Sequence, residues 1–198
     1  MRERNLPVKI LVLLALPLVG ILAVTNESVA QDMGRTGKGE VFGIWQMMGK
    51  DTASGGGVDL NFDESHLFGF GLGYNIDENL NVNTDFLFGS SDLNAAGVTG
   101  DTNIIAWDVN LDYNFMEGNF TPLVTGGIGF MNFDGDFGSG SASFSETDFS
   151  YNLGAGVRWE FNDNMFLKAV YRFNWVKLED TDSALLMDGL HVAFGITF

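Results

Sequence analysis

Polar and apolar side chains alternate one by one along most of this chain. Residues 104–115, IIAWDVNLDYNF, show the pattern most cleanly. From Ile105 onward every second residue is apolar or aromatic, and the residues between them are Ala, Asp or Asn. Successive side chains of a β-strand point to opposite faces, so this period of two predicts a strand with one apolar and one polar face.

The same alternation recurs along the chain, and no segment beyond residue 40 shows a convincing helical period. Eight strands are expected, at residues 40–48, 66–76, 80–89, 104–115, 120–131, 148–161, 165–176 and 188–198. Most of them have about ten residues, which is the length that a tilted strand needs to cross a bilayer. The alternation is poor in 40–48, so the faces of that strand cannot be assigned. In 120–131, Val124, Ile128 and Phe130 are expected on one face.

The segments between these strands alternate in length. Short connections fall at 77–79, 116–119 and 162–164, and long ones at 49–65, 90–103, 132–147 and 177–187. Short and long connections in strict order are typical of an up-and-down outer-membrane barrel, with tight periplasmic turns and longer outer loops.

The two faces of the strands decide between a soluble sheet and a membrane barrel. The polar face carries mainly Gly, Asn, Ser and Asp, which are small enough for the interior of an eight-stranded barrel. The apolar face is rich in aromatic residues, several of them near strand ends as in interfacial girdles: Tyr74, Trp107, Tyr113, Trp159, Tyr171 and Trp175. We therefore predict an all-β protein, an eight-stranded antiparallel up-and-down transmembrane β-barrel with an apolar outside and a polar interior of small residues.

A secreted eight-stranded sandwich or a lipocalin-like barrel would share the strands and their alternation. It would have to bury the large apolar residues of every strand in a single core, which is too many for a sheet of this size. The prediction thus depends on the bulky apolar side chains facing outward.

The first 30 residues have the pattern of a signal peptide. A basic start, MRERNLPVK, precedes an uncharged apolar run at 10–24, and the small residues Ser28 and Ala30 suit signal peptidase. We predict cleavage after Ala30, then a flexible periplasmic lead at 31–39 and a barrel domain at 40–198. An uncleaved anchor is the alternative, although the run is shorter than the roughly 20 residues of a spanning helix.

Composition excludes some classes of function. The chain of 198 residues has no Cys, which rules out disulfides and thiolate metal sites. It has 10 Lys and Arg against 26 Asp and Glu, a net charge of −16, whereas a nucleic-acid partner requires a basic surface.

The chain resembles the small eight-stranded outer-membrane β-barrel proteins of Gram-negative bacteria, the porin-family or OmpA-transmembrane-like group. The segments that carry this resemblance are 68–86, 120–130, 151–173 and 189–198. It implies a location in the cell outer membrane. We expect the barrel to be a monomer in contact with outer-membrane lipid and lipopolysaccharide. The resemblance also implies that the C-terminal Phe198 is part of the signal read by the barrel-assembly machinery. It names no substrate, because one fold hosts many functions.

Charged side chains are expected on the inner face of the strands. A buried charge is costly unless it is paired, so these residues are predicted to form an interior ion-pair network: Asp85, Asp108, Asp112, Arg158, Glu160, Lys168, Arg172 and His191. The turn at 162–164 places Arg158 opposite Lys168. Glu160 lies diagonal to Lys168, and Asp108 or Asp112 can reach it from across the lumen. We expect this network to block continuous water flow.

No catalytic or metal site is predicted, and no cofactor. Residues 171–180 resemble the start of a lipid A deacylase motif, but Trp175 and Lys177 stand where that motif has His and Ser. His66 near a strand end is more typical of a solvated loop residue than of a catalytic one. Residues 132–140 resemble a calcium loop, yet Phe137 replaces the Gly that such a loop requires.

The expected function is therefore a non-enzymatic structural or surface role, in envelope integrity or adhesion. A narrow passage for small, mostly apolar solutes is the alternative, which the expected polar interior weakly disfavours. A lipid A-modifying enzyme is the third possibility.

Overall fold

The structure is a computed structural model that describes residues 34–55, 58–95, 98–137, 142–177 and 184–198. The predicted signal peptide and its cleavage site lie outside these residues. Within them, no helix is long and apolar enough to cross a membrane.

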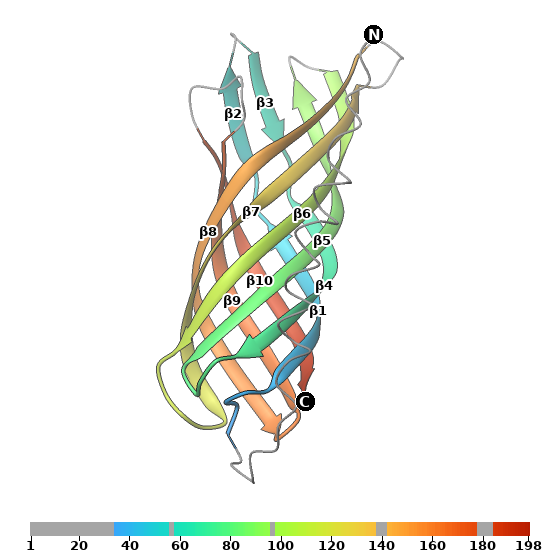
Figure 1. Cartoon of the computed structure of the whole chain (residues 1–198). Coiled ribbons are helices and arrows are strands. Elements are labelled where there is room, and N and C mark those ends of the chain that lie inside the picture. The colour runs from blue at the N-terminus through green and yellow to red at the C-terminus, as the bar shows by residue number, and fades with distance from the viewer. Residues whose placement is uncertain (1–33, 56–57, 96–97, 138–141, 178–183) are drawn as a thin grey trace.

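The described residues form ten antiparallel strands, eight of which close into a barrel (Figure 1). The bounds of the strands are β1 Gly39–Met48, β2 Asp51–Gly55, β3 Val58–Phe62, β4 Ser65–Asn75, β5 Leu80–Ala95, β6 Val98–Asn114, β7 Phe120–Phe137, β8 Ala142–Asn162, β9 Met165–Val176 and β10 Leu185–Thr197. Around the barrel, β1 pairs with β4 and β10, and the β5–β6 pair completes the ring. Strands β2 and β3 form an additional hairpin beside β5.

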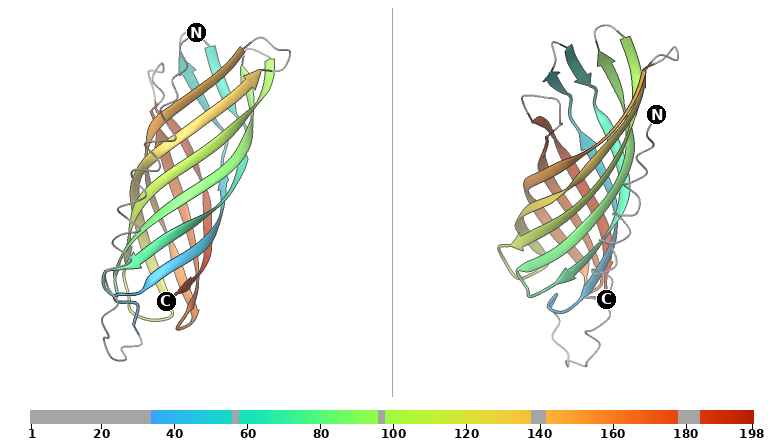
Figure 2. Two further views of the ribbon diagram at one scale, coloured as in Figure 1. Left: turned by 45° about the vertical axis from the view of Figure 1, so that its right-hand side comes forward. Right: turned by 45° about the horizontal axis from the view of Figure 1, so that its top comes forward.

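The two ends of the barrel differ, and Figure 2 shows both. We call the lower end in Figure 1 the turn end, where residues 76–79, 115–119 and 163–164 join the strands and both Gly39 and Phe198 lie. We call the opposite end, which carries β2 and β3, the loop end. The short connections match the predicted ones to within a residue or two.

The predicted long loops are largely strand. Pairing of β5 with β6 continues to Ala95 and Val98, and pairing of β7 with β8 continues to Phe137 and Ala142. Most of 90–103 and 132–147 therefore belongs to the sheet, and 49–65 contains the β2–β3 hairpin. Alternation gave no sign of these extensions, because beyond the bilayer neither face of a strand has to be apolar.

The bulky side chains face outward, as predicted. Phe68 is 60% exposed, Ile128 59% and Leu153 57%. Most of their neighbours along each strand are buried in the barrel interior. Strand β1, whose faces the sequence left unassigned, follows the same rule and turns Glu40 and Gln46 inward.

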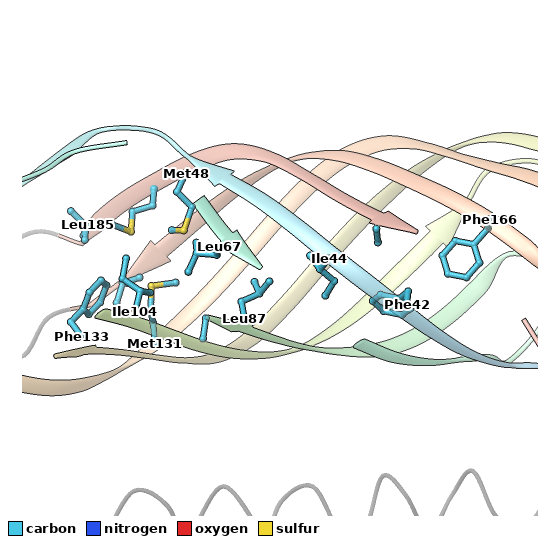
Figure 3. Packing of buried hydrophobic residues seen from close by; sticks show 14 residues of the cluster. Phe42, Ile44, Met48, Leu67, Leu87, Ile104, Met131, Phe133, Phe166 and Leu185 are labelled. Carbon is cyan, nitrogen blue, oxygen red and sulfur yellow. The ribbon is translucent and has the colours of Figure 1, made fainter. Parts of the chain in front are cut away.

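The interior contains apolar groups as well as the expected polar ones. A cluster at the loop end includes Met48, Leu67, Leu87, Ile104, Met131, Phe133 and Leu185, whereas Phe42 and Phe166 lie nearer the turn end (Figure 3). The expectation of a polar interior is thus incomplete. A narrow barrel has to be filled, and an apolar side chain fills space without needing a hydrogen-bond partner.

Inward-facing glycines make room for the largest interior side chains. A Cβ atom added at Gly71 would lie 2.2 Å from the ring of Phe42, and one added at Gly195 would lie 2.5 Å from the Cβ of Phe42. The ring of Phe42 therefore fits only because strands β4 and β10 carry no side chain at these positions. Small and large residues alternate around the barrel in a complementary way.

Candidate functional site in the lumen

Three buried ion pairs lie inside the barrel. Lys168 Nζ is 2.8 Å from Asp112 Oδ2, and Arg172 Nη1 is 3.0 Å from Asp85 Oδ2. Toward the turn end, Arg158 Nη2 is 2.6 Å from Glu40 Oε1. Each of the six side chains is at most 3% exposed. Charges so far from water persist only with close partners, so these pairs depend on each other.

Aromatic rings support two of the cations. The guanidinium of Arg158 lies 4.1 Å from the ring centre of Phe166, and Lys168 Nζ lies 5.2 Å from that of Phe42. The negative face of an aromatic ring attracts a cation more strongly where water is excluded. The inner phenylalanines thus fill the lumen and also stabilise its charges.

The register places Arg158 directly opposite Lys168, the pair that the 162–164 turn predicts. Of the acidic partners considered for Lys168, the structure places Asp112 beside it, and Glu160 contacts Arg158 instead. Glu160 Oε1 accepts a hydrogen bond from Arg158 Nε at 3.1 Å, and Lys168 reaches across to Asp112. Glu40 was missed because the faces of its strand could not be read from the sequence.

Among the described residues, neither Asp108 nor His191 forms an ion pair as close as those above. Ser150 Oγ donates to Asp108 Oδ1 at 3.4 Å. His191 Nδ1 lies 3.0 Å from Gln46 Oε1, and its Nε2 lies 3.9 Å from Asp85 Oδ2. Gln46 is a second inward residue of β1 that the sequence could not place.

Asparagine side chains join the ion pairs into one network. Asn83 Nδ2 donates to Asp112 at 3.0 Å, and Asn110 Nδ2 donates to Asp85 at 3.0 Å and to Asn83 Oδ1 at 3.3 Å. Nearer the turn end, Asn81 links Glu40 to Asn83, because Asn81 Nδ2 donates to Glu40 at 3.2 Å and Asn81 Oδ1 accepts from Asn83 at 2.9 Å. Direct contacts therefore run from the middle of the lumen to its turn end.

The segment before β1 takes part in this arrangement. Arg35 is 4% exposed and its Nη2 donates to the carbonyl oxygen of Met116 at 3.2 Å. Its Nε lies 3.7 Å from Glu160 and 3.9 Å from Glu78. Residues 34–38 are the described part of the predicted flexible lead, and nothing in their sequence identified Arg35 as a residue of the barrel mouth.

Burial and charge shift the pKa of two groups at this mouth, outside the membrane-spanning strands. Burial lowers the pKa of Arg35, against the opposing effect of the Glu160 carboxylate. Burial alone would raise the pKa of Glu78. Hydrogen bonds from Thr36 and Arg35, together with the charge of Arg35, outweigh burial, and the pKa of Glu78 is lowered.

His66 and its sequence neighbour Ser65 are not arranged to act together. His66 is exposed, its Nε2 lies 3.8 Å from Glu64, and its ring stacks on Trp45. Ser65, its neighbour, is buried on the opposite face of β4 and so cannot act with it. Among the described residues, no group of three or more His, Cys, Asp or Glu is placed to hold a metal ion. The calcium-like segment 132–140 extends into residues outside the description.

The strands thus form a closed barrel with aromatic residues on its outside and a filled lumen. Comparison with known proteins identifies the family to which such a barrel belongs. Residues 14–198 match the family described as outer membrane protein beta-barrel domain. The chain belongs to this family. It is an outer-membrane β-barrel, as the resemblance in its sequence implied.

Solved structures agree with this assignment. The outer-membrane barrel is similar to OprG from Pseudomonas aeruginosa, with a TM-score of 0.66 and 14% identity over 85% of this chain and 99% of that one. Neisserial surface protein A gives a TM-score of 0.57 and 16% identity, over 82% and 98% of the two chains. Ail, the attachment invasion locus protein of Yersinia pestis, gives 0.53 and 15%, over 82% and 99%. At these identities the likeness shows the fold. No curated protein matches the sequence.

Proposed function

We propose that this outer-membrane barrel is a non-enzymatic component of the cell envelope with a structural or surface-interaction role, in envelope integrity or adhesion. The observation that carries the proposal is the filling of the lumen. The apolar cluster occupies the loop end, the Arg172–Asp85 and Lys168–Asp112 pairs occupy the middle, and the Arg158–Glu40 pair lies near the turn end.

Passage of water through this lumen would require several of these layers to separate. The charged pairs are nearly inaccessible, and breaking one of them leaves a buried charge without a partner, at a cost of several kcal/mol. The filled lumen therefore favours a function carried out by the outer surfaces of the barrel over a function as an open pore.

Single-channel recording in planar bilayers tests this proposal. We expect the purified full-length barrel to insert without large, stable openings, while a known open porin reconstituted in the same way conducts. Large and stable openings from the intact protein would contradict it.

The loop end is the surface that an adhesion role would use. Its strands extend beyond the apolar band and expose acidic side chains, among them Asp92, Asp101, Asp134 and Glu146. Ail has been solved in complex with the heparin analogue sucrose octasulfate. An acidic surface repels such a polyanion, so for this chain we propose neutral or cationic surface partners, or lipopolysaccharide bridged by divalent cations.

Binding to lipopolysaccharide vesicles with Mg²⁺ or with a chelator distinguishes these partners. Cation-bridged contact predicts binding that the chelator reverses, whereas contact with lipid alone predicts binding that the chelator leaves unchanged. Binding of heparin beads at physiological salt would contradict the electrostatic argument.

A passage for small apolar solutes is a second candidate, favoured by the apolar cluster at the loop end. Leu67, Leu87 and Met131 form an apolar layer in the lumen against which an apolar solute could bind. The polar network lies beneath this layer, so the solute would have to leave through the barrel wall. Uptake of an apolar fluorophore into liposomes, compared between the native barrel and L67N, tests it. Uptake equal to that of empty liposomes would exclude this role.

A lipid A-modifying activity is the third candidate, and the separation of His66 from Ser65 argues against it. Thin-layer analysis of lipid A after expression of the barrel measures such activity directly. An unchanged lipid A pattern is expected.

A further inference from the structure

We propose that residues 34–38 form a clasp that closes the turn-end mouth of the barrel, with Arg35 as the side chain that seals it. This inference concerns a segment outside the eight barrel strands and goes beyond the structural or surface role proposed above. It predicts that the turn end can open while the barrel itself stays intact.

Backbone geometry fixes the path of the clasp. Gly37 has a φ of 76°, a conformation that favours glycine, and Lys38 N donates to the carbonyl oxygen of Arg35 at 3.1 Å. On the barrel side, Gly37 N donates to Asn75 O at 2.8 Å and Asn75 N donates to Lys38 O at 3.0 Å. This tight turn, paired with the end of β4, places Arg35 at the mouth.

Side-chain contacts tie the clasp to the turns. Glu78, in the β4–β5 turn, accepts hydrogen bonds from Arg35 N at 3.1 Å, Thr36 N at 3.0 Å and Thr36 Oγ1 at 2.7 Å. The guanidinium of Arg35 reaches Met116 O in the β6–β7 turn and lies near Glu160 at the end of β8. One side chain thereby bridges three parts of the barrel that are distant in sequence.

The clasp adjoins the charged network of the lumen. Glu160 Oε1 lies 3.7 Å from Arg35 Nε and 3.1 Å from Arg158 Nε, and Arg158 in turn pairs with Glu40. Arg35 is therefore part of a series of alternating charges that runs from Glu78 through Glu160 and Arg158 to Glu40. Its burial shields the Arg158–Glu40 layer from solvent at the turn end.

The ion pairs of Arg35 are longer than those inside the lumen, which makes this side chain the part of the clasp that can move. The ion pairs of Arg35 span 3.7 and 3.9 Å, and Glu78 is 28% exposed. The pairs within the lumen span 2.6–3.0 Å and are almost fully buried. Exposed and long ion pairs contribute little stability, whereas close buried ones are hard to break.

Space for movement is present beside Arg35. A recess of about 270 Å³ is lined by Arg35, Glu78, Glu117 and Glu160. Arg35 Nη1 is buried and has no hydrogen-bond partner among the described residues. A guanidinium that leaves one donor unused is held less firmly than a fully bonded one. Arg35 can thus swing out without displacing a barrel strand.

Because the chain contains no Cys, a single introduced thiol reports access to the mouth. Thr121 is fully buried on the inner face of β7, opposite Arg158, so T121C places the thiol just inside the clasp. The experiment measures the rate at which a membrane-impermeant maleimide labels T121C in the folded barrel. It compares the unmodified clasp with R35A, with R35K and with K38A, which removes a positive charge from the same segment.

We expect R35A to raise the labelling rate about tenfold, R35K to raise it less, and K38A to leave it within about twofold. Folding of each variant is checked by its heat-modifiable migration in gels. If R35A does not fold, E78Q, which weakens the clasp from the barrel side, must raise the rate instead. The proposal would be overturned if R35A left the labelling rate unchanged, or if K38A raised it as much as R35A. Where R35A does not fold, an unchanged rate in E78Q would overturn it.

Discussion

At the scale of single residues, each charge inside the barrel depends on a partner from a distant strand. Lys168 on β9 pairs with Asp112 on β6, and both are 3% exposed. Neither charge can be hydrated in place. Removing one charge of a pair should therefore lower the free energy of unfolding more than removing both charges.

The K168M variant tests this dependence. We expect it to lower the free energy of unfolding by about 3–5 kcal/mol, because Asp112 stays buried without its cation. The double variant K168M/D112N should recover more than half of that loss. Urea titrations of the barrel in lipid vesicles measure both, and a double variant as unstable as K168M would contradict the explanation.

A second prediction concerns the glycines beside Phe42. G71A should destabilise the barrel by about 1–3 kcal/mol, because the new methyl group overlaps the ring of Phe42. The matched control is G43A on the neighbouring strand, where an added Cβ meets nothing within 4 Å. The same urea titrations should show little change for G43A. Equal losses of stability in the two variants would show that the overlap with Phe42 does not decide the cost.

At the scale of elements, the clasp and the extended strands are the features most sensitive to solution conditions. The pKa of Glu78 is lowered below its ordinary value of 4.5 through its bonds to the clasp. A group with a lowered pKa in the folded state stabilises that state above its unfolded pKa, and this stabilisation is lost as the pH falls through the folded pKa. The clasp should thus stay closed at neutral pH and open only in acid.

The NMR signals of the Arg35 and Thr36 amides, which donate to Glu78, should report this titration. We expect a midpoint below pH 4.5 that disappears in E78Q. The charged groups facing Glu78 are Arg35 from the clasp, Glu117 from the β6–β7 turn and Glu160 from β8. A midpoint above 4.5 would mean that the two other carboxylates outweigh Arg35.

The strand extensions at the loop end bring like charges together. Asp101 on β6 lies directly opposite Asp92 on β5 in the sheet register, and both side chains are exposed. Like charges at such positions destabilise a sheet, so D101N should stabilise the barrel by about 0.2–1 kcal/mol. The gain should shrink at high salt, because Asp101 is exposed and its repulsion is screened. A gain that salt leaves unchanged would point to another cause.

At the scale of the whole molecule, the first and last strands complete the barrel. Residues Glu40–Gln46 of β1 pair with His191–Thr197 of β10, and Gly39 and Phe198 exchange two backbone hydrogen bonds of 2.9 Å. Every backbone group inside the bilayer has to be paired, so a barrel that fails to close here cannot be stable in lipid.

Removing Phe198 tests its predicted role in assembly. We expect the shortened chain to reach the outer membrane in reduced amount, as measured by membrane fractionation and heat-modifiable gels, while the purified chain still refolds in detergent. A Phe198→Tyr variant, which keeps the aromatic ring, serves as control. Normal assembly without residue 198 would exclude this role.

Much of this architecture follows from local pattern. The alternation predicted all eight barrel strands, the outward faces of those that follow β1, and the short turns, because the period of two is a property of neighbouring residues. The strand extensions, the faces of β1 and the apolar layers were missed. There the alternation is weak. Strand residues outside the bilayer contact water on both faces, and the lumen accepts both polar and apolar side chains.

By itself, the sequence determined that this protein is a barrel with its bulky side chains in lipid and with charges inside. Only the tertiary structure decided which charges meet. Glu40 and Arg158 are 118 residues apart in sequence, and Asp85 and Arg172 are 87 apart. Such partners are set by the tilt and register of the closed sheet, which depend on all of its strands at once. The same closure brings Arg35, from a segment with no pattern of its own, onto the mouth of the barrel.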